Sequence, residues 1–254
     1  MLTFTAAQLM AWIGMYLWPF LRVLALFMAA PLFSHRSIPL RVKIGLGVAI
    51  AVAIAPTLPL QQQVSLDSAQ VLPLVIQQVL IGLALGFMVR LAMAGIELAG
   101  ELIGLQMGLS FAGFFDPQSQ KGGNAVGGWL GVIAMLIFLG INGHLLLIYT
   151  LAESFQSFPI GQGQFSINDT KSLVTAGAEV FRLGLHIALP FIAVLLIVNV
   201  TLGVMVRVAP QLNLMAVGMP ATITVGMASL FLLLPYLEQP LTRALERSLT
   251  GLTR

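Results

Sequence analysis

The residues best suited to chemistry are a few charged side chains in very apolar surroundings. Glu97 and Glu101 are one helical turn apart, so a helix would place both carboxylates on the same side. A catalytic pair is conceivable. However, two ionised carboxylates at this spacing repel each other, and each is costly in hydrocarbon. We therefore expect them to face protein, partner cations or water, and we favour a polar contact with a partner helix.

Two further residues could take part in catalysis. Asp116 could be an intramembrane catalytic aspartate, but it precedes Pro117, and this pair of residue types typically begins a turn. Ser110 resembles a nucleophile elbow only loosely, because Ala112 replaces the second glycine of Gly-x-Ser-x-Gly and no His/Asp partner is evident. We favour the turn for Asp116 and discount Ser110.

The sequence predicts no metal, cofactor or nucleic-acid partner. The chain has no cysteine, which excludes thiolate chemistry and Cys-ligated metals. His35, His144 and His186 are far apart, without the paired spacing of a zinc site. The net charge is only +3, whereas a nucleic-acid footprint needs a clustered basic face. No Gly-x-x-x-x-Gly-Lys-Ser/Thr phosphate loop occurs. We expect a protein that is not an enzyme, with any nucleotide chemistry in another subunit.

The elements that position these residues are predicted to be membrane helices. Of 254 residues, 58% are hydrophobic and only 8% are charged, whereas a soluble domain carries about 25% charged residues. In lipid the backbone must be satisfied within helices, so the expected fold is all-α, built from helical hairpins. A helix crosses a bilayer core with about 20 apolar residues. Seven segments qualify: about 9–33, 43–60, 71–90, 94–115, 125–151, 183–206 and 208–237.

Prolines and one arginine mark the limits of these segments. Arg22 interrupts the first, Pro56 and Pro59 end the second, and Pro235 and Pro240 close the last. The first segment lacks the basic region and the small-residue cleavage site of a signal peptide, so we expect it to be retained.

Basic residues indicate an orientation for a seven-segment chain. They cluster within 36–43 and near the C-terminus, which the positive-inside tendency places in the cytoplasm. An outside N-terminus and an inside C-terminus satisfy this tendency and put Arg90 inside. Arg207 and Lys121 then fall outside.

One polar insertion, ESFQSFPIGQGQFSINDTKS at 153–172, separates the chain into two parts. Asn168 or Asp169 can cap the helix that follows. We expect an N-terminal helical bundle over 1–172 and a C-terminal helical hairpin over 173–254.

Glycines repeat at every fourth position on both sides of the Asp-Pro break. Small residues at this spacing let helix backbones approach closely where lipid offers no hydrophobic drive. Ordinary helix packing explains each ladder, although their placement around one break is less ordinary. The ladders are Gly100, Gly104 and Gly108 before the break and Gly123, Gly127 and Gly131 after it, with a similar pair at Gly82 and Gly86.

A polar cluster lies between the last two apolar segments. The hydrophobic run is interrupted by Arg207, Pro210, Gln211 and Asn213. Proline at position 210 cannot continue a regular helix. The cluster forms either a hairpin tip, which we favour, or the lining of a hydrated space. Arg207, like Arg90, is expected to pair between helices or to lie near an aqueous path.

Four motifs together resemble the FliR family of type III secretion export-gate subunits. They are GLQMGLSFAGFFDPQSQ (104–120), NGH (142–144), APQLN…VGMP (209–213 and 217–220) and SIPLRVKIGLGVAIA (37–51). The similarity covers essentially the whole chain in the expected order.

The resemblance implies a core subunit of the flagellar type III export gate in the bacterial inner membrane, within the flagellar basal body. It implies a FliP-like N-terminal part joined to a FliQ-like hairpin. It also implies assembly with FliP- and FliQ-like subunits, association with FlhB- and FlhA-like proteins, and passage of unfolded flagellar subunits. Members of the family sit partly above the bilayer plane once assembled.

The resemblance also implies that a loop at about 107–120 plugs the pore. Aromatic and methionine side chains can fill an irregular lumen. Glycines and the Asp-Pro break let the segment move at little backbone cost. The residues placed in the plug are Met107, Phe111, Phe114, Phe115, Asp116 and Pro117.

Three alternatives stay open at this stage. A virulence type III secretion paralogue would share the motifs. A small-solute transporter working alone usually shows paired broken helices in two repeats, whereas only one strongly broken segment stands out here. A membrane-embedded hydrolase would depend on Asp116 or Ser110.

Overall fold

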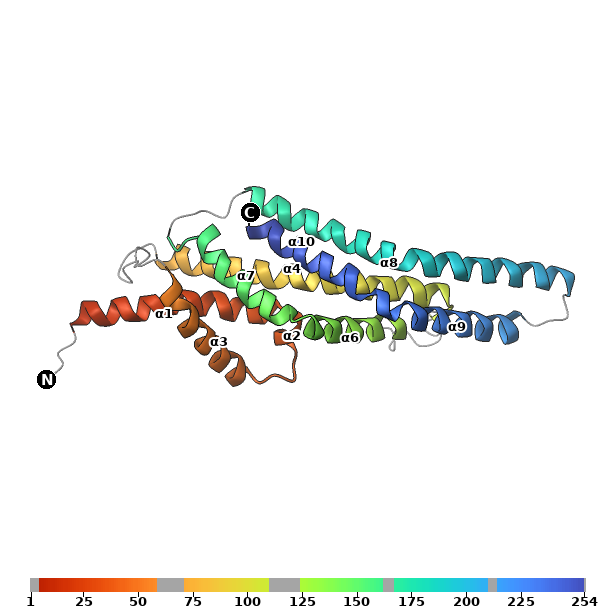
Figure 1. The fold of residues 1–254 in the computed structure, drawn as a ribbon, viewed down its shortest axis with the longest axis horizontal. Helices are drawn as coiled ribbons and strands as arrows, with labels where there is room; N and C mark the ends of the chain where they lie inside the picture. Colours follow the sequence, from red (N-terminus) through yellow and green to blue (C-terminus); the bar gives the residue numbers. More distant parts are fainter. Residues whose placement is uncertain (1–4, 59–70, 110–123, 162–166, 210–213, 254) are drawn as a thin grey trace. The chain divides into compact units, whose positions relative to one another are not determined.

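The computed structural model describes residues 5–58, 71–109, 124–161, 167–209 and 214–253, in which every regular element is helical (Figure 1). The all-α prediction is confirmed. The α-helices are α1 (Ala6–Ala29), α2 (Pro31–Ser34), α3 (Leu40–Ile54), α4 (Val71–Gln106), α6 (Ala125–Gly140), α7 (Gly143–Ser157), α8 (Ile167–Val208), α9 (Leu214–Leu233) and α10 (Glu238–Thr253). Two short 3₁₀ turns, η1 (Ala55–Thr57) and η5 (Leu234–Tyr236), follow α3 and α9.

Four helical stretches in the described chain are long and apolar enough to cross a membrane. They are Trp12–Ala29, Leu40–Thr57, Val71–Gln106 and Val174–Val208. Two bent helix pairs raise the count to six if each pair is one span. The pairs are α6 with α7, bent by 67°, and Val217–Leu232 with Leu234–Leu249, bent by 47°.

The seven-segment prediction was wrong at α4. This single helix of 36 residues covers two of the predicted segments, 71–90 and most of 94–115. Arg90 lies inside it with an exposed side chain. Arginine is a good helix former, so a charge at the surface does not end a helix. An orientation inferred from an odd number of crossings therefore loses its basis.

Both described ends of the polar insertion are helical, and the caps differ from the expectation. Helix α7 extends to Ser157, and α8 begins at Ile167. Asn168 and Asp169 therefore lie inside the first turn of α8 and do not precede it as caps. The predicted boundary at 172/173 also falls within α8, and the division into 1–172 and 173–254 stays a prediction.

Proline limits two helices as expected. Helix α3 ends at Ile54, just before Pro56, and α9 ends at Leu233, just before Pro235. Pro240 instead lies in the first turn of α10, where a missing backbone N–H costs no helical hydrogen bond.

The chain divides into two compact units, each drawn from separate stretches of sequence. Unit 1 comprises Met1–Arg90, Asn142–Ala176 and Leu245–Arg254. Unit 2 comprises Leu91–Ile141 and Gly177–Ala244.

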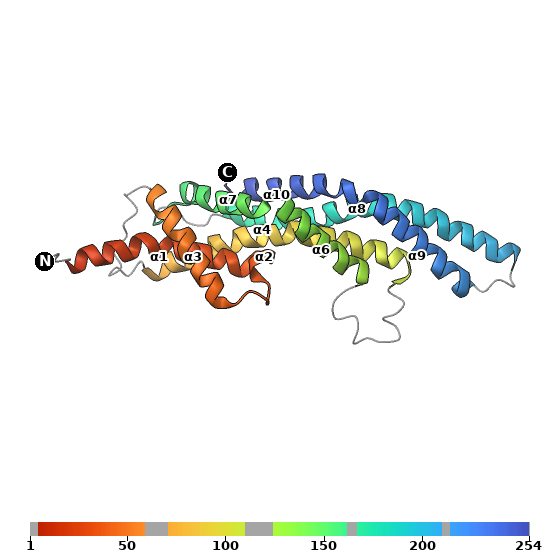
Figure 2. The ribbon, with the colours of Figure 1, turned by 60° about the horizontal axis from the view of Figure 1, so that its bottom comes forward.

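In unit 1, α1 packs closely on the first half of α4, beside which it runs in Figures 1 and 2. A Cβ atom built on Gly82 would collide with the backbone carbonyl oxygen of Arg22 and lie 2.8 Å from the Cβ atom of Ala25. One built on Gly86 would lie 2.7 Å from the Leu26 carbonyl oxygen. Because Gly82 contacts Arg22 and Gly86, four residues later, contacts Leu26, also four residues later, α1 and this part of α4 run parallel.

Helix α3 lies against the other side of α1, as both ribbon views show. Gly47 makes this approach, because its missing Cβ atom would lie 3.4 Å from the ring of Phe20. The buried side chains of unit 1 are mostly large and apolar, including Trp18, Phe27, Ile81, Leu85 and Phe155.

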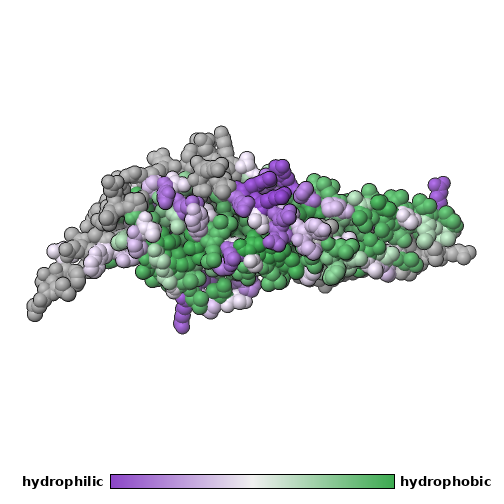
Figure 3. Space-filling model, in the orientation of Figure 1, coloured by the Kyte–Doolittle hydropathy of each residue, from purple (hydrophilic) through white to green (hydrophobic). Residues whose placement is uncertain are grey.

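In unit 2, small residues again set the spacing between helices. A Cβ atom on Gly100 of α4 would lie 2.6 Å from the Cα atom of Gly127 in α6. One on Gly184 of α8 would lie 3.0 Å from the carbonyl oxygen of Gly95. Many large apolar side chains of α8 are exposed, among them Phe181, Ile197 and Val208, and Figure 3 shows a mainly hydrophobic surface over the C-terminal half of α8, beyond a hydrophilic patch.

Candidate functional site

The end of α4 in unit 2 is held by α9. Met107 follows the last residue of α4 and is completely buried. Its backbone carbonyl oxygen lies 3.1 Å from the hydroxyl oxygen of Thr222, which donates to it. Gly226, one turn further along α9, leaves room for the Met107 side chain. Gly108 then turns the chain out of the helix with φ = 84°, a conformation that favours glycine.

A cavity of about 500 Å³ lies beside this anchor, within unit 2. Its walls come from the end of α4, from α8 and from α9, and they combine apolar side chains with two amides. Gln106 and Asn199 supply those amides. Few convergent polar groups line it, which fits a space for a side chain or for water better than a catalytic site.

The start of α6 is held by Glu101 of α4. The side-chain oxygen of Asn124 accepts a hydrogen bond from the backbone N–H of Gly127 at 2.8 Å, which caps α6. The side-chain nitrogen of Asn124 donates to the Glu101 carbonyl oxygen at 2.9 Å. The backbone N–H of Asn124 donates to the Glu101 carboxylate, also at 2.9 Å.

The two glycine ladders meet across α4 and α6. Besides the close pair Gly100 and Gly127, Gly104 lies against the side chain of Asn124, and Gly131 lies against that of Glu97. The order of these contacts makes α4 and α6 antiparallel, with the segment 107–123 joining their ends.

The remaining predicted residues do not gather around one point. Arg90, Glu97 and Arg207 are exposed on their helices, and their contacts with partner helices stay predictions. Several of the predicted positions lie outside the described residues, namely Phe111, Phe114, Phe115, Asp116, Pro117, Gly123, Gln211 and Asn213. Among the residues that are described, no three His, Asp or Glu side chains come together as metal ligands.

Unit 1 contains a buried cation that links three helices. Arg22 of α1 is completely buried. Its guanidinium donates to the side-chain oxygens of Gln78 in α4 and Ser154 in α7, at 2.8 and 2.9 Å. It also donates to the carbonyl oxygen of Phe158 at 2.9 Å and stacks 3.8 Å above the ring of Phe155. All these partners are neutral, so hydrogen bonds and the ring face hold the charge.

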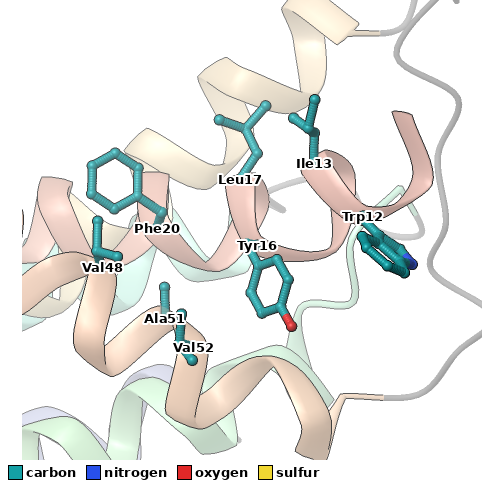
Figure 4. Close-up of a pocket in the computed structure, with 8 residues that line it drawn as sticks. All are labelled: Trp12, Ile13, Tyr16, Leu17, Phe20, Val48, Ala51 and Val52. Atoms are coloured by element: carbon teal, nitrogen blue, oxygen red, sulfur yellow. The ribbon is translucent and has the colours of Figure 1, made fainter. Parts of the chain in front are cut away.

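Unit 1 also has an apolar groove of about 480 Å³ between α1 and α3. Figure 4 shows Tyr16 pointing from α1 toward Ala51 and Val52 of α3, with Phe20 beside Val48. The lining is almost entirely apolar, so this groove can receive hydrocarbon or an apolar helix face and has no groups for catalysis.

Comparison with known proteins places the chain in a family. A model described as bacterial export proteins, family 1, matches residues 13–248. The chain belongs to this family. Flagellar biosynthetic protein FliR of Escherichia coli (strain K12) is 46% identical over 235 residues, which cover 92% of this chain and 90% of that protein. FliR of Pectobacterium carotovorum subsp. carotovorum is 47% identical over the same shares, and FliR of Bacillus subtilis (strain 168) is 31% identical over 214 residues.

These matches confirm the resemblance drawn from four sequence motifs. As a member of the bacterial export family, the chain is related to proteins of flagellar biosynthesis over nearly its full length. The matches by themselves say nothing about individual residues, whose roles come from the geometry above.

The structural roles of two residues were not predicted from the sequence. Arg22 was read as an interruption, although a charge inside an apolar helix signals a buried polar partner. Gln78 and Ser154, polar residues in otherwise apolar helices, were the available signal. Asn124 was overlooked as well, although an Asn directly before an apolar helical run is a typical N-cap.

The Gly226 contact makes a testable prediction. In Gly226→Ala the new methyl group would lie 2.6 Å from Cγ of Met107, so the buried side chain has to move. Overpacking of this kind typically costs about 1–3 kcal/mol. We expect a lower midpoint of thermal unfolding in detergent. Gly203→Ala is the matched control, because a Cβ atom on Gly203 meets nothing within 4 Å; equal midpoints for the two variants would contradict the Met107 anchor.

Proposed function

We propose that this chain is a core subunit of the flagellar type III protein export gate. The observation that carries the proposal is the match to flagellar FliR proteins along nearly the whole chain, at 46% identity to that of Escherichia coli. Long apolar helices fit a subunit embedded in the bacterial inner membrane. The relatives named above are all flagellar, which supports flagellar over virulence use.

The proposed role includes partners. The subunit assembles with FliP- and FliQ-like proteins, through a FliP-like N-terminal part and a FliQ-like C-terminal hairpin, and associates with FlhB- and FlhA-like proteins. Unfolded flagellar subunits pass through the assembled pore. Exposed apolar side chains along α8, of which Ile197 and Val208 are examples, support a helix that packs against other subunits or lipid.

We further propose that the segment 107–120 plugs the closed pore. The support is that both flanks of the segment are held in unit 2, by Thr222 at Met107 and by Glu101 at Asn124. A segment tethered at both ends returns to one place after it has moved. Phe111, Phe114 and Phe115 then supply the bulk that blocks the lumen.

Removing that bulk tests the plug. Deleting Phe111–Phe115 is expected to make the assembled complex leak ions while assembly stays intact, because the flanking anchors are untouched. The measurement is ion flux through the purified complex in lipid vesicles, with native mass spectrometry to verify that FliP- and FliQ-like subunits are still present. Replacing Phe111, Phe114 and Phe115 with serine at constant length should leak as well, whereas Phe181→Ser, at an exposed position on α8, should not. If the deletion variant assembles correctly and stays ion-tight, the segment 107–120 does not plug the pore.

One observation favours a second candidate, a transporter that works alone. The described chain contains two bent helix pairs, and paired broken helices are typical of secondary transporters. Transport by the purified chain in vesicles, without partners, would support this candidate. Co-purification with FliP- and FliQ-like subunits and an inactive lone chain would support the export gate.

A further inference from the structure

Two hydrogen bonds join Asn124 to Glu101, at the point where the two ends of the segment 107–123 meet the helices α4 and α6. Asn124 makes three hydrogen bonds of 2.8 to 2.9 Å: its side-chain oxygen accepts from Gly127, and its side-chain and backbone nitrogens both donate to Glu101. One residue thus caps α6 and ties the start of α6 to the last turns of α4.

The surrounding glycines leave room for this arrangement. A Cβ atom on Gly104 would lie 2.6 Å from Cγ of Asn124, so a larger residue at position 104 would push the amide away. A Cβ atom on Gly127 would collide with the carboxylate of Glu101. By contrast, a Cβ atom on Gly128 meets nothing within 4 Å. The space at Gly104 and Gly127 serves the Asn124–Glu101 contact as well as the approach of the helices.

Asparagine suits this position because of its two kinds of polar atom. Its amide offers one acceptor and two donors, whereas serine and aspartate can cap a helix but lack the amide donor. Glu101 offers two acceptors to this residue, its side-chain oxygen and its backbone carbonyl oxygen. The N-terminus of α6 also favours a negative charge nearby. A carboxylate in an apolar helix is thereby accounted for without catalysis.

We infer that Asn124 is a positioning residue, which together with Glu101 holds the ends of α4 and α6 at a set separation and so fixes where the segment between them emerges. The inference rests on the proposed plug for its functional consequence. Its structural content, the fixed separation, is independent of that proposal.

Asn124→Ser separates this role from helix capping. Serine keeps an N-cap acceptor for Gly127 and loses the donor to the Glu101 carbonyl oxygen. We expect a state in which the ends of α4 and α6 lie further apart to become about fivefold more populated, the factor that corresponds to the loss of one net hydrogen bond. Glu101→Gln keeps an oxygen acceptor for the backbone N–H of Asn124 but replaces the carboxylate with a neutral amide, so we expect a smaller shift than in Asn124→Ser. Gly128→Ala is the control for a change in the first turn of α6.

The separation can be measured directly, because the chain has no cysteine of its own. Leu105, near the end of α4, and Ala125, at the start of α6, both have exposed side chains. Leu105→Cys and Ala125→Cys can therefore carry a pair of spin labels. The assembled complex is formed with cysteine-free partner subunits and with labelled chain diluted in unlabelled chain. The distance distribution is recorded alongside ion leak for each variant.

The outcomes separate this inference from the proposed function. A broader distance distribution and a raised leak in Asn124→Ser, with neither change in Gly128→Ala, support the positioning role. An unchanged distribution in Asn124→Ser overturns it. A broadened distribution together with an ion-tight Phe111–Phe115 deletion keeps the positioning role and removes the plug.

Discussion

Replacing Arg22 with alanine is expected to lower the free energy of unfolding by about 3 kcal/mol, as breaking a buried polar network does. The guanidinium is completely buried and donates to Gln78, Ser154 and the Phe158 carbonyl oxygen. Alanine leaves a cavity and removes the donors from all three acceptors. The measurement is the unfolding midpoint in detergent, followed by the yield of assembled complex.

Two variants sharpen that result. Arg22→Lys keeps the charge, but a single ammonium cannot reproduce the planar fork that reaches three acceptors, so we expect only partial recovery. Arg182→Ala is the control, because its side chain is 72% exposed and its ion pair is with the neighbouring Glu179, one turn away, a contact of about 0.5 kcal/mol. Equal midpoints for Arg22→Ala and Arg182→Ala would show that the buried network contributes little.

Gly82→Leu is expected to destabilise unit 1 by about 3 kcal/mol, the upper end of the usual cost of overpacking. The first atom of the new side chain would already collide with the Arg22 carbonyl oxygen. Because that atom belongs to a helix backbone, no side-chain rotation relieves the clash, and α1 must move away from α4. Thermal unfolding in detergent and the yield of assembled complex measure the effect.

Gly45→Leu provides the comparison for Gly82→Leu. Gly45 lies in α3, and a Cβ atom there meets nothing within 4 Å. Leucine is the better helix former, so this change should raise stability, by up to about 1 kcal/mol. If both variants lowered the midpoint equally, added hydrophobic bulk would be the cause and the close α1–α4 contact would not.

Properties that depend on local composition could be predicted from the sequence. A charged fraction of 8% leaves too few polar groups to cover a soluble domain, and helices follow from the need to satisfy the backbone in lipid. Proline ended α3 and α9 where expected, because its missing N–H acts within one turn. The spacing of glycines along one helix could likewise be read from the sequence. The sequence did not show which other helix these glycines would contact.

Properties that depend on distant partners could not be predicted. Arg22 finds acceptors 56 and 132 positions away, and no periodicity of an apolar helix encodes such a pairing. The same holds for Glu101, whose partner Asn124 lies beyond the predicted plug. The segment count failed for a different reason: residues 71–90 and 94–115 were predicted as separate segments, whereas the exposed charge of Arg90 leaves the backbone of α4 undisturbed.

The length of two helices has a consequence for how the protein exists in the cell. At 1.5 Å per residue, the 36 residues of α4 extend about 54 Å and the 42 residues of α8 about 63 Å, roughly twice the 30 Å that lipid tails can cover. Most of the apolar stretch of α4 is buried within the chain, whereas most of that of α8 is not, so we expect other proteins of the export apparatus to cover α8 beyond the bilayer. Partner binding therefore contributes to folding stability by mass action. We expect subunit made in excess of its partners to be cleared by proteolysis, so that the partner supply sets its abundance.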